Sequence, residues 1–362
     1  MRRTTKSIPI GPIRVGGEEP IIVQSMCDTD TRDVSKTVEQ ILRLEEAGCE
    51  LIRVAVLDQQ AAESIGAIKR QIHIPLVADI HFDYRLALTA LKQGVDKLRI
   101  NPGNIGVEER VRAVVEEAKV REVPIRIGVN GGSLEKHILA KFGRPSAEAM
   151  VESALSHIQI LERYDFDQIL VSVKASNVLE TIQAYRLLSK KVNYPLHLGI
   201  TEAGPPGTGI VRTSVGMGVL LAEGIGDTLR VSLSGDPAEE VHVAWQILKS
   251  LELRQRGITL ISCPTCGRRK GDVYTISAEV EKRLRDYQGP PITVAVMGCE
   301  VNGPLEAKHA DIGIAFGVEQ ALLFVKGKIV AKITPDVYMH ALFEQIDILR
   351  REKTTGSKVI DK

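Results

Sequence analysis

The chain has 362 residues, of which 44% are hydrophobic, and this length and composition suit one large and one smaller globular domain. Its 47 basic and 46 acidic residues leave a formal net charge of +1, so the overall charge does not favour binding to nucleic acid or to an anionic membrane. The N-terminal residues lack the apolar core of a signal peptide and no later apolar run has the length of a membrane span, so we expect a cytoplasmic protein.

The first part of the chain, residues 1–256, repeats one pattern: a short β-branched run, a polar or glycine-containing turn and a longer amphipathic stretch. Eight strands are predicted, at residues 21–26, 51–56, 76–81, 97–101, 125–130, 169–174, 196–201 and 229–234. Eight strands alternating with helices close a parallel (β/α)8 barrel of the TIM type. Residues 7–15, with Gly11-Pro12 at their centre, are expected to form a hairpin that plugs the bottom of this barrel.

The pattern changes in residues 257–362, after the charged, glycine-containing junction at Arg256-Gly257. Short strands are predicted at residues 259–262, 292–296, 312–315, 321–325 and 329–333, with helices at 277–287 and 335–350. This mixture is typical of a separate α+β domain. The polar tail, residues 353–362, is expected to be frayed.

Three cysteines in this second part indicate a metal site. Cys263 and Cys266 form a Cys-x-x-Cys pair, Cys299 follows downstream, and no fourth cysteine is near. A closed structural zinc site needs four strong ligands, whereas a four-iron cluster held by three cysteines leaves one iron for a weaker ligand or a substrate. In a reducing compartment such a pair is metal-binding or redox-active, so the incomplete set indicates chemistry at an iron.

Four predicted barrel strands place a cation among apolar neighbours: Arg53, Arg99, Arg126 and Lys174. Such a side chain near the carboxyl end of a barrel strand is expected to point into the barrel mouth. For any one of them a structural ion pair with a carboxylate is an equal alternative. Four together favour an anion site, and because arginine binds phosphate oxygens in bidentate fashion, a diphosphate fits.

Further polar side chains stand where the predicted strands end. They are Asp79, His81, Asn101, Asn104, Asn130, Ser133, Thr201, Glu202, Ser232 and Ser234. Catalytic residues of TIM-type barrels come from the carboxyl ends of the strands. We therefore expect these side chains around the same mouth as the cations.

Several motifs, in order along both parts of the chain, resemble those of the 4-hydroxy-3-methylbut-2-enyl diphosphate synthase family. They are Gln24-Ser25-Met26, Asp79-Ile80-His81-Phe82, Arg99-Ile100-Asn101-Pro102-Gly103-Asn104, Arg126-Ile127-Gly128-Val129-Asn130, Ser172-Val173-Lys174, Gly199-Ile200-Thr201-Glu202, Cys263-Pro264-Thr265-Cys266-Gly267-Arg268 and Val301-Asn302-Gly303-Pro304. Each motif alone is weak, but their number and order make the resemblance specific.

The resemblance implies a barrel followed by a small iron-sulfur domain that is similar to half of a sulfite reductase. It implies a reductase of isoprenoid biosynthesis that opens 2-C-methyl-D-erythritol 2,4-cyclodiphosphate and removes water, with two electrons delivered singly by flavodoxin or ferredoxin. The implied cofactor is a [4Fe-4S] cluster held by Cys263, Cys266, Cys299 and Glu306. The implied assembly is a homodimer that pairs the barrel of one subunit with the cluster domain of the other.

The same resemblance gives roles to the barrel residues. The substrate-binding set is expected to be Arg53, Arg99, Arg126 and Lys174, assisted by Asn101, Asn130 and Ser232. Asp79, His81 and Glu202 are expected to orient the substrate and to supply protons, because reductive loss of water requires an acid nearby. Glu306, an oxygen ligand, is expected to leave its iron more readily than a thiolate does.

Two alternatives stay open from the residues alone. One is a non-redox phosphate-binding barrel enzyme, such as an aldolase or a pterin-type synthase, with a structural zinc domain. The other is a regulatory module that senses redox state through a labile cluster. Two departures from the family pattern also concern the proposed site: Cys27-Asp28 stands where Thr-Asn is expected, and Leu305 stands where glycine is favoured beside Glu306.

Overall fold

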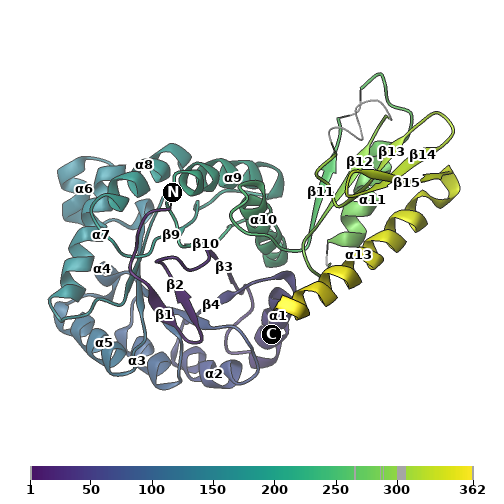
Figure 1. Cartoon of the computed structure of the whole chain (residues 1–362). Helices are drawn as coiled ribbons and strands as arrows, with labels where there is room; N and C mark the ends of the chain where they lie inside the picture. The colour runs from purple at the N-terminus through teal and green to yellow at the C-terminus, as the bar shows by residue number, and fades with distance from the viewer. Residues whose placement is uncertain (1, 265, 286, 288, 300–306, 361–362) are drawn as a thin grey trace. The chain divides into compact units, whose positions relative to one another are not determined.

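A computed structural model describes residues 2–264, 266–285, 287, 289–299 and 307–360. The chain divides into two compact units, Met1–Arg254 and Gln255–Lys362 (Figure 1). The junction predicted after Arg256 lies close to this division.

The first unit is a barrel of eight parallel strands (Figure 1). They are β3 (Ile22–Met26), β4 (Leu51–Ala55), β5 (Leu76–Asp79), β6 (Lys97–Ile100), β7 (Ile125–Asn130), β8 (Ile169–Lys174), β9 (His197–Leu198) and β10 (Thr228–Leu229). Their order is β8-β7-β6-β5-β4-β3-β10-β9, and a parallel bridge between Val171 and Leu196 joins the two ends of the sheet. The predicted barrel is confirmed.

The last two strands are shorter than the sequence predicts, with two residues each. After β9 the chain enters a turn in which Glu202 has φ 54° and Gly204 has φ 104°. A residue with left-handed backbone angles cannot continue a strand. The strand therefore ends earlier than the apolar run past Leu198 predicts.

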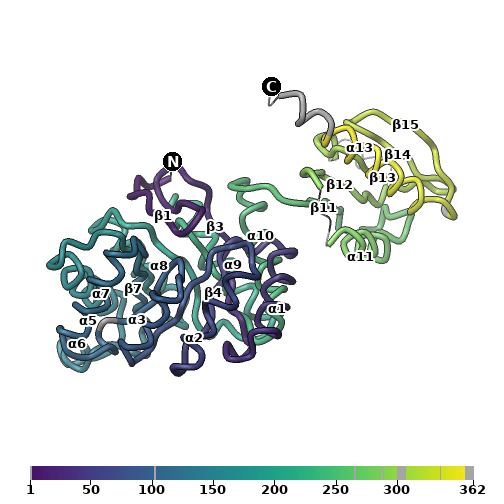
Figure 2. The backbone as a smooth tube through the Cα atoms, turned by 90° about the horizontal axis from the view of Figure 1, so that it is seen from below, coloured from purple at the N-terminus to yellow at the C-terminus, as the bar shows by residue number. Residues whose placement is uncertain are grey.

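The hairpin of β1 (Ile8–Ile10) and β2 (Ile13–Val15) is antiparallel and closes one end of the barrel (Figure 2). It turns at Gly11, which has φ 53°. Its apolar side chains pack against residues at the start of four barrel strands, namely Ile22, Leu51, Val77 and Leu170. The predicted plug is confirmed, and the carboxyl ends of the strands lie at the opposite end.

Helices follow the strands and cover the outside of the barrel (Figure 1). They are α1 (Val34–Ala47), α2 (Gln59–Lys69), α3 (Tyr84–Lys92), α4 (Pro102–Ile105), α5 (Glu108–Val120), α6 (Lys136–Phe142), α7 (Ala147–Glu162), α8 (Val178–Ser189), α9 (Pro206–Ala222) and α10 (Pro237–Ser250), with the short 3-10 helix η1 (Gly131–Ser133). Several begin at an Asp or Asn whose side chain accepts a backbone N–H of the first turn, as Asp58 and Asn177 do. Each such cap fixes where the loop that precedes its helix stops.

The second unit contains one five-stranded sheet in the order β11-β12-β13-β14-β15. The strands are β11 (Ile258–Ser262), β12 (Ile292–Met297), β13 (Ile312–Phe316), β14 (Ala321–Val325) and β15 (Lys328–Ile333), and the helices are α11 (Val273–Leu284), η2 (Pro335–Val337) and α13 (Tyr338–Ile360). β11, β12 and β13 pair in parallel, and the remaining pairs are antiparallel. All five predicted strands are present within a residue or so of their expected ends.

α11 and α13 differ from their predicted bounds. α11 begins earlier because Asp272 caps it by accepting the Thr275 N–H at 3.1 Å. The tail predicted to be frayed continues α13 to Ile360. Lys353 holds this segment to the sheet, since its Nζ lies 2.9 Å from Asp311 Oδ1 and donates to the Pro291 carbonyl at 2.8 Å. No helix in the described part of the chain is long and apolar enough to cross a membrane.

Candidate active site

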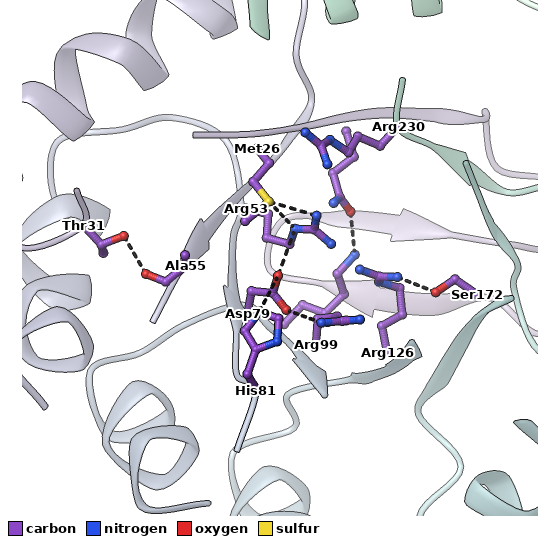
Figure 3. Close-up of polar contacts among 12 residues, drawn as sticks. Met26, Thr31, Arg53, Ala55, Asp79, His81, Arg99, Arg126, Ser172 and Arg230 are labelled. Atoms are coloured by element: carbon purple, nitrogen blue, oxygen red, sulfur yellow. Dashed lines mark hydrogen bonds and ion pairs between the residues drawn. The ribbon is translucent and has the colours of Figure 1, made fainter. Parts of the chain in front are cut away.

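The four predicted cations are buried in the barrel, and Figure 3 shows three of them, Arg53, Arg99 and Arg126. Arg53, Arg99 and Lys174 are 7–8% exposed, and Arg126 is 1% exposed. They come from β4, β6, β7 and β8, and Arg99 and Arg126 are direct partners in the ladder between β6 and β7. The expectation that these side chains point inward is therefore confirmed.

Asp79, the last residue of β5, joins three of the surrounding groups (Figure 3). Its Oδ1 accepts a hydrogen bond from Arg99 Nη1 at 3.0 Å, and its Oδ2 lies 3.6 Å from Arg53 Nε and 3.7 Å from His81 Nε2. Burial raises the pKa of Asp79, but the charges of Arg53 and Arg99 outweigh burial and lower it to about 2. Asp79 is thus an ionised anchor for two arginines.

Arg126 and Lys174 have no such anchor among the described residues. Arg126 Nη1 donates to Ser172 Oγ at 2.5 Å, while Nε and Nη2 are buried with no hydrogen-bond partner in the described part of the protein. Burial lowers the pKa of both Arg126 and Lys174, and the neighbouring cation Arg53 lowers each further. These two groups are the ones that most need a bound anion.

The structure adds two more cations to the site, the buried Lys97 and the half-buried Arg230. Lys97 Nζ donates to Gln24 Oε1 at 3.2 Å, and burial lowers its pKa. Arg230 follows β10, and its Nη2 lies 3.2 Å from Glu240 Oε2 on α10. Burial raises the pKa of Glu240, although the carboxylate also accepts the Leu233 N–H at 2.8 Å.

The sequence analysis did not assign Lys97, Ser172 or Arg230 to the site. The two-residue period of a strand nevertheless indicates the first two. Lys97 stands two residues before Arg99, and Ser172 stands two residues before Lys174, so each shares a face with an assigned cation. Arg230 directly follows the eighth strand. Its partner Glu240 comes from the following helix, and no periodicity in the sequence links the two.

Two glycines leave the space that two of the cations occupy. A Cβ added to Gly128 on β7 would lie 2.5 Å from Arg99 Nε, and one added to Gly199 would lie 2.3 Å from Lys174 Nζ. Heavy atoms do not approach this closely in proteins. The Arg99 guanidinium therefore lies directly against the backbone of Gly128, and the Lys174 ammonium lies directly against the backbone of Gly199.

The remaining predicted residues lie at the strand ends. Asn101 is 4% exposed and caps α4, accepting the Gly103 N–H at 3.1 Å. Asn130 ends β7, and Ser232 lies half-buried shortly after β10. Glu202 is exposed in the turn after β9, and the His81 side chain is 43% exposed. Among the described residues, His81 lies beside Asp79, but no hydrogen bond or ion pair joins Asn101, Asn130, Glu202 or Ser232 to the cations.

The three predicted cysteine ligands lie at or near the carboxyl end of the second sheet. Cys263 follows β11 and Cys299 follows β12, which are parallel neighbours paired up to Ser262 and Val296. Cys263 Sγ accepts the Gly298 N–H at 3.0 Å, and Cys266 is exposed. Cys27 and Cys49, the other two cysteines, are buried.

This donor set suits a metal that prefers sulfur, because the thiols are reduced, partly accessible and presented by adjacent strand ends. Within the described ranges, however, no three His, Cys, Asp or Glu side chains already form a closed group around a metal position. The predicted fourth ligand, Glu306, and its neighbour Leu305 lie outside the described residues.

The sequence matches two family profiles, a GcpE TIM-barrel domain over residues 5–245 and a GcpE protein C-terminal domain over residues 259–348. The chain is 56% identical over 353 residues to 4-hydroxy-3-methylbut-2-en-1-yl diphosphate synthase (flavodoxin) of Geobacter sulfurreducens, covering 98% of this chain and 100% of that protein. It is 57% identical over 345 residues to the protein of the same name from Ruminiclostridium cellulolyticum, covering 95% and 98%.

Among solved structures, dihydropteroate synthase of Yersinia pestis matches with a TM-score of 0.50 and 12% identity, covering 69% of this chain and all of that one. At this identity the match supports the barrel fold alone. The family matches, in contrast, extend over both units and confirm the resemblance predicted from the motifs rather than a non-redox barrel with a structural zinc domain. The chain belongs to the GcpE family, the family of 4-hydroxy-3-methylbut-2-en-1-yl diphosphate synthases.

Proposed function

We propose that this chain converts 2-C-methyl-D-erythritol 2,4-cyclodiphosphate into 4-hydroxy-3-methylbut-2-enyl diphosphate by reductive ring opening and loss of water. The observation that supports this most strongly is the group of buried cations in the barrel, above all Arg126, whose Nε and Nη2 lack partners among the described residues. An isolated buried charge is costly, and a bound diphosphate would remove that cost. The names of the relatives give the product, and the family resemblance implies the cyclic substrate.

Charge balance supports a ligand with more than one negative charge. Arg53 and Arg99 share the single carboxylate of Asp79, while Arg126 donates to a neutral hydroxyl. A diphosphate offers several oxygens that can accept hydrogen bonds from guanidinium and ammonium groups at once. We assign Arg53, Arg99, Arg126 and Lys174 to its two phosphoryl groups and add Arg230 to the set.

Neutral side chains at the strand ends would orient the ring. Asn101, Asn130 and Ser232 lie at the carboxyl ends of β6, β7 and β10, where their amide and hydroxyl groups can bind phosphate or hydroxyl oxygens. Asp79 would act through the arginines that it anchors, because its low pKa keeps it ionised and so unable to donate a proton.

His81 and Glu202 are the proposed proton donors. The two electrons of the reduction break the ring bond between carbon and the phosphate oxygen, which leaves as a phosphate oxyanion. The electron pair left on that carbon forms the C=C bond as hydroxide leaves the neighbouring carbon, and this hydroxide takes a proton to become water. His81 is half-exposed beside Asp79, a position from which its imidazole can exchange protons with solvent and reach a ligand at the mouth. Glu202 is exposed in the turn after β9, at the same end of the barrel.

Cys263, Cys266 and Cys299 would hold a [4Fe-4S] cluster, with Glu306 as the fourth ligand. When bound, such a cluster supplies the electrons one at a time. The Gly298 N–H that already donates to Cys263 Sγ would stabilise the thiolate form of this ligand.

We further propose flavodoxin as the electron donor, as the relatives are named, with ferredoxin as an alternative. Because substrate and cluster ligands lie in separate units, we propose a homodimer in which the barrel of one subunit works with the cluster domain of the other. We propose a cytoplasmic location, where a reducing environment would keep the cysteine ligands as thiols.

The proposal is tested by purifying the protein without oxygen and measuring iron, sulfide and zinc per chain. The cyclic diphosphate is then supplied with a strong one-electron reductant while the linear diphosphate is followed. About four irons per chain with product formation would support the proposal. Zinc at about one per chain, with no product, would favour the non-redox alternative.

A further inference from the structure

A pair formed by a buried histidine and a half-buried glutamate lies behind the loop that follows β6, and the proposed chemistry does not use it. His157, on α7, is 3% exposed, and its Nε2 is in ion-pair contact with Glu135 Oε1. Ser153, one helical turn before His157, donates through Oγ to both carboxylate oxygens of Glu135, at 2.8 and 3.1 Å. Three polar side chains therefore form one network under the barrel surface.

Glu135 is oriented by this network rather than by its own helix. It occupies the N-cap position of α6, but its side chain makes no capping hydrogen bond there. Burial raises the pKa of Glu135, yet the contact with His157 outweighs burial and lowers it to about 2. The carboxylate is therefore ionised and points from the start of α6 toward α7.

The loop after β6 rests directly on this pair. A Cβ added to Gly103 would lie 3.1 Å from Glu135 Oε1 and 3.3 Å from His157 Cε1, so the Gly103 backbone is in contact with both side chains. The Gly103 N–H donates to Asn101 Oδ1 at 3.1 Å, and the Asn104 N–H donates to the Asn101 carbonyl at 2.9 Å. The position of Gly103 thus determines how the Asn101 amide is turned.

The same carboxylate also belongs to the segment that follows β7. Asn130 ends that strand, η1 follows immediately, and Glu135 comes just after it. This pair therefore ties two neighbouring loops of the barrel mouth to α7. Each loop begins with an asparagine of the proposed substrate site.

We propose that Glu135 and His157 are positioning residues, which touch no substrate but hold Asn101 in the orientation that binds the cyclic diphosphate. The inference rests on the proposed function, because Asn101 is assigned there to the substrate. A pair that only stabilised the fold would alter the unfolding midpoint without acting through Asn101. A positioning pair must instead alter binding of the cyclic diphosphate through Asn101.

The test is a double-mutant cycle on the affinity for the cyclic diphosphate, measured by calorimetry on the full chain. We expect Glu135→Gln to weaken binding about five- to tenfold, and the double variant with Asn101→Ala to bind no more weakly than Asn101→Ala alone. In steady-state assays the loss should appear in KM more than in kcat. The matched control is His73→Gln, which alters an exposed pair with Glu45 whose Nδ1 and Oε2 atoms are 2.8 Å apart.

If Glu135→Gln does not fold, Gly103→Ala provides a second route, because its methyl group would press on the same carboxylate and should weaken binding likewise. Unchanged affinity for the cyclic diphosphate in these variants would overturn the inference while leaving the proposed function intact. Losses of affinity that multiply with the loss caused by Asn101→Ala would do the same. Wild-type protein that does not bind the cyclic diphosphate would overturn both.

Discussion

Asp79 and Arg99 face each other across neighbouring strands β5 and β6, and the 3.0 Å hydrogen bond from Arg99 Nη1 to Asp79 Oδ1 fixes the guanidinium inside the barrel. The carboxylate also lies near Arg53. One anion thus organises two of the cations, whereas Arg126 and Lys174 remain for a ligand to neutralise. The cations of the site therefore differ in whether a carboxylate of the protein neutralises them.

Replacing Asp79 by Asn should destabilise the ligand-free protein by about 3–5 kcal/mol, because it leaves Arg53 and Arg99 as buried charges without a counter-ion. Chemical denaturation with and without inorganic diphosphate measures this. Added diphosphate should recover part of the loss. A variant as stable as wild type would mean that the arginines are not held by Asp79.

The stability contributed by Asp79 should depend on pH in one direction. Its pKa is lowered to about 2 in the folded protein, so its contribution is present above the unfolded pKa of about 4 and is lost as the pH falls toward 2. The ionisation of Asp79 contributes roughly 2 kcal/mol to the free energy of unfolding at neutral pH. The difference in unfolding free energy between wild type and Asp79→Asn should therefore shrink between about pH 5 and pH 2. A constant difference would contradict the assignment.

Arg126→Met should make the ligand-free protein more stable, by about 1 kcal/mol or more, while abolishing substrate binding. The variant replaces an unanchored buried charge with an apolar side chain of similar length, and such replacements are often stabilising. Thermal unfolding and calorimetric titration measure the two effects. Arg43→Met, which breaks an exposed pair with Asp236, should change stability by less than about 0.5 kcal/mol. Reduced stability of Arg126→Met would indicate a structural role instead.

Gly199→Ala should weaken binding of the cyclic diphosphate about tenfold, which corresponds to about 1.4 kcal/mol. The new methyl group would meet the flexible end of Lys174, so the ammonium should move while the barrel stays folded. The control is Gly218→Ala on α9, where a Cβ would have no neighbour within 4 Å. Equal affinity of both variants would show that the position of Lys174 does not matter for binding.

Cys263→Ser and Cys299→Ser should each abolish or strongly reduce bound iron and sulfide, because each removes a proposed ligand. Cys49→Ala should retain the full amount, because Cys49 is buried in the barrel and its thiol donates to the Leu51 carbonyl. Iron and sulfide analysis of protein purified without oxygen measures this. Iron that persists in both serine variants would place the cluster on other residues.

The barrel could be predicted from sequence because its strands are buried on both faces, so that each appears as an apolar run. The cations inside it were visible for the same reason, since a charge such as Arg53 or Arg126 within such a run has to point inward. The shortness of β9 was not visible, because Ile200 continues the apolar run while Glu202 adopts a left-handed turn that sequence does not encode plainly.

The pairing of the charges could not be predicted. That Asp79 anchors Arg99, or that Glu240 approaches Arg230, depends on how strands and helices meet in three dimensions. The support of Gly103 by Glu135 and His157 is of the same kind, since the three residues come from separate loops and a helix. The cysteine spacing indicated the metal site, whereas the ligand role of Glu306 depends on the family resemblance.

The most direct test of the central claim is a crystal structure of the protein with the cyclic diphosphate bound. The proposed function predicts diphosphate oxygens within hydrogen-bond distance of Lys174 Nζ and of Arg126 Nε and Nη2, the two atoms that lack partners among the described residues. A cyclic diphosphate bound elsewhere, with these atoms satisfied by protein groups or by water alone, would contradict it.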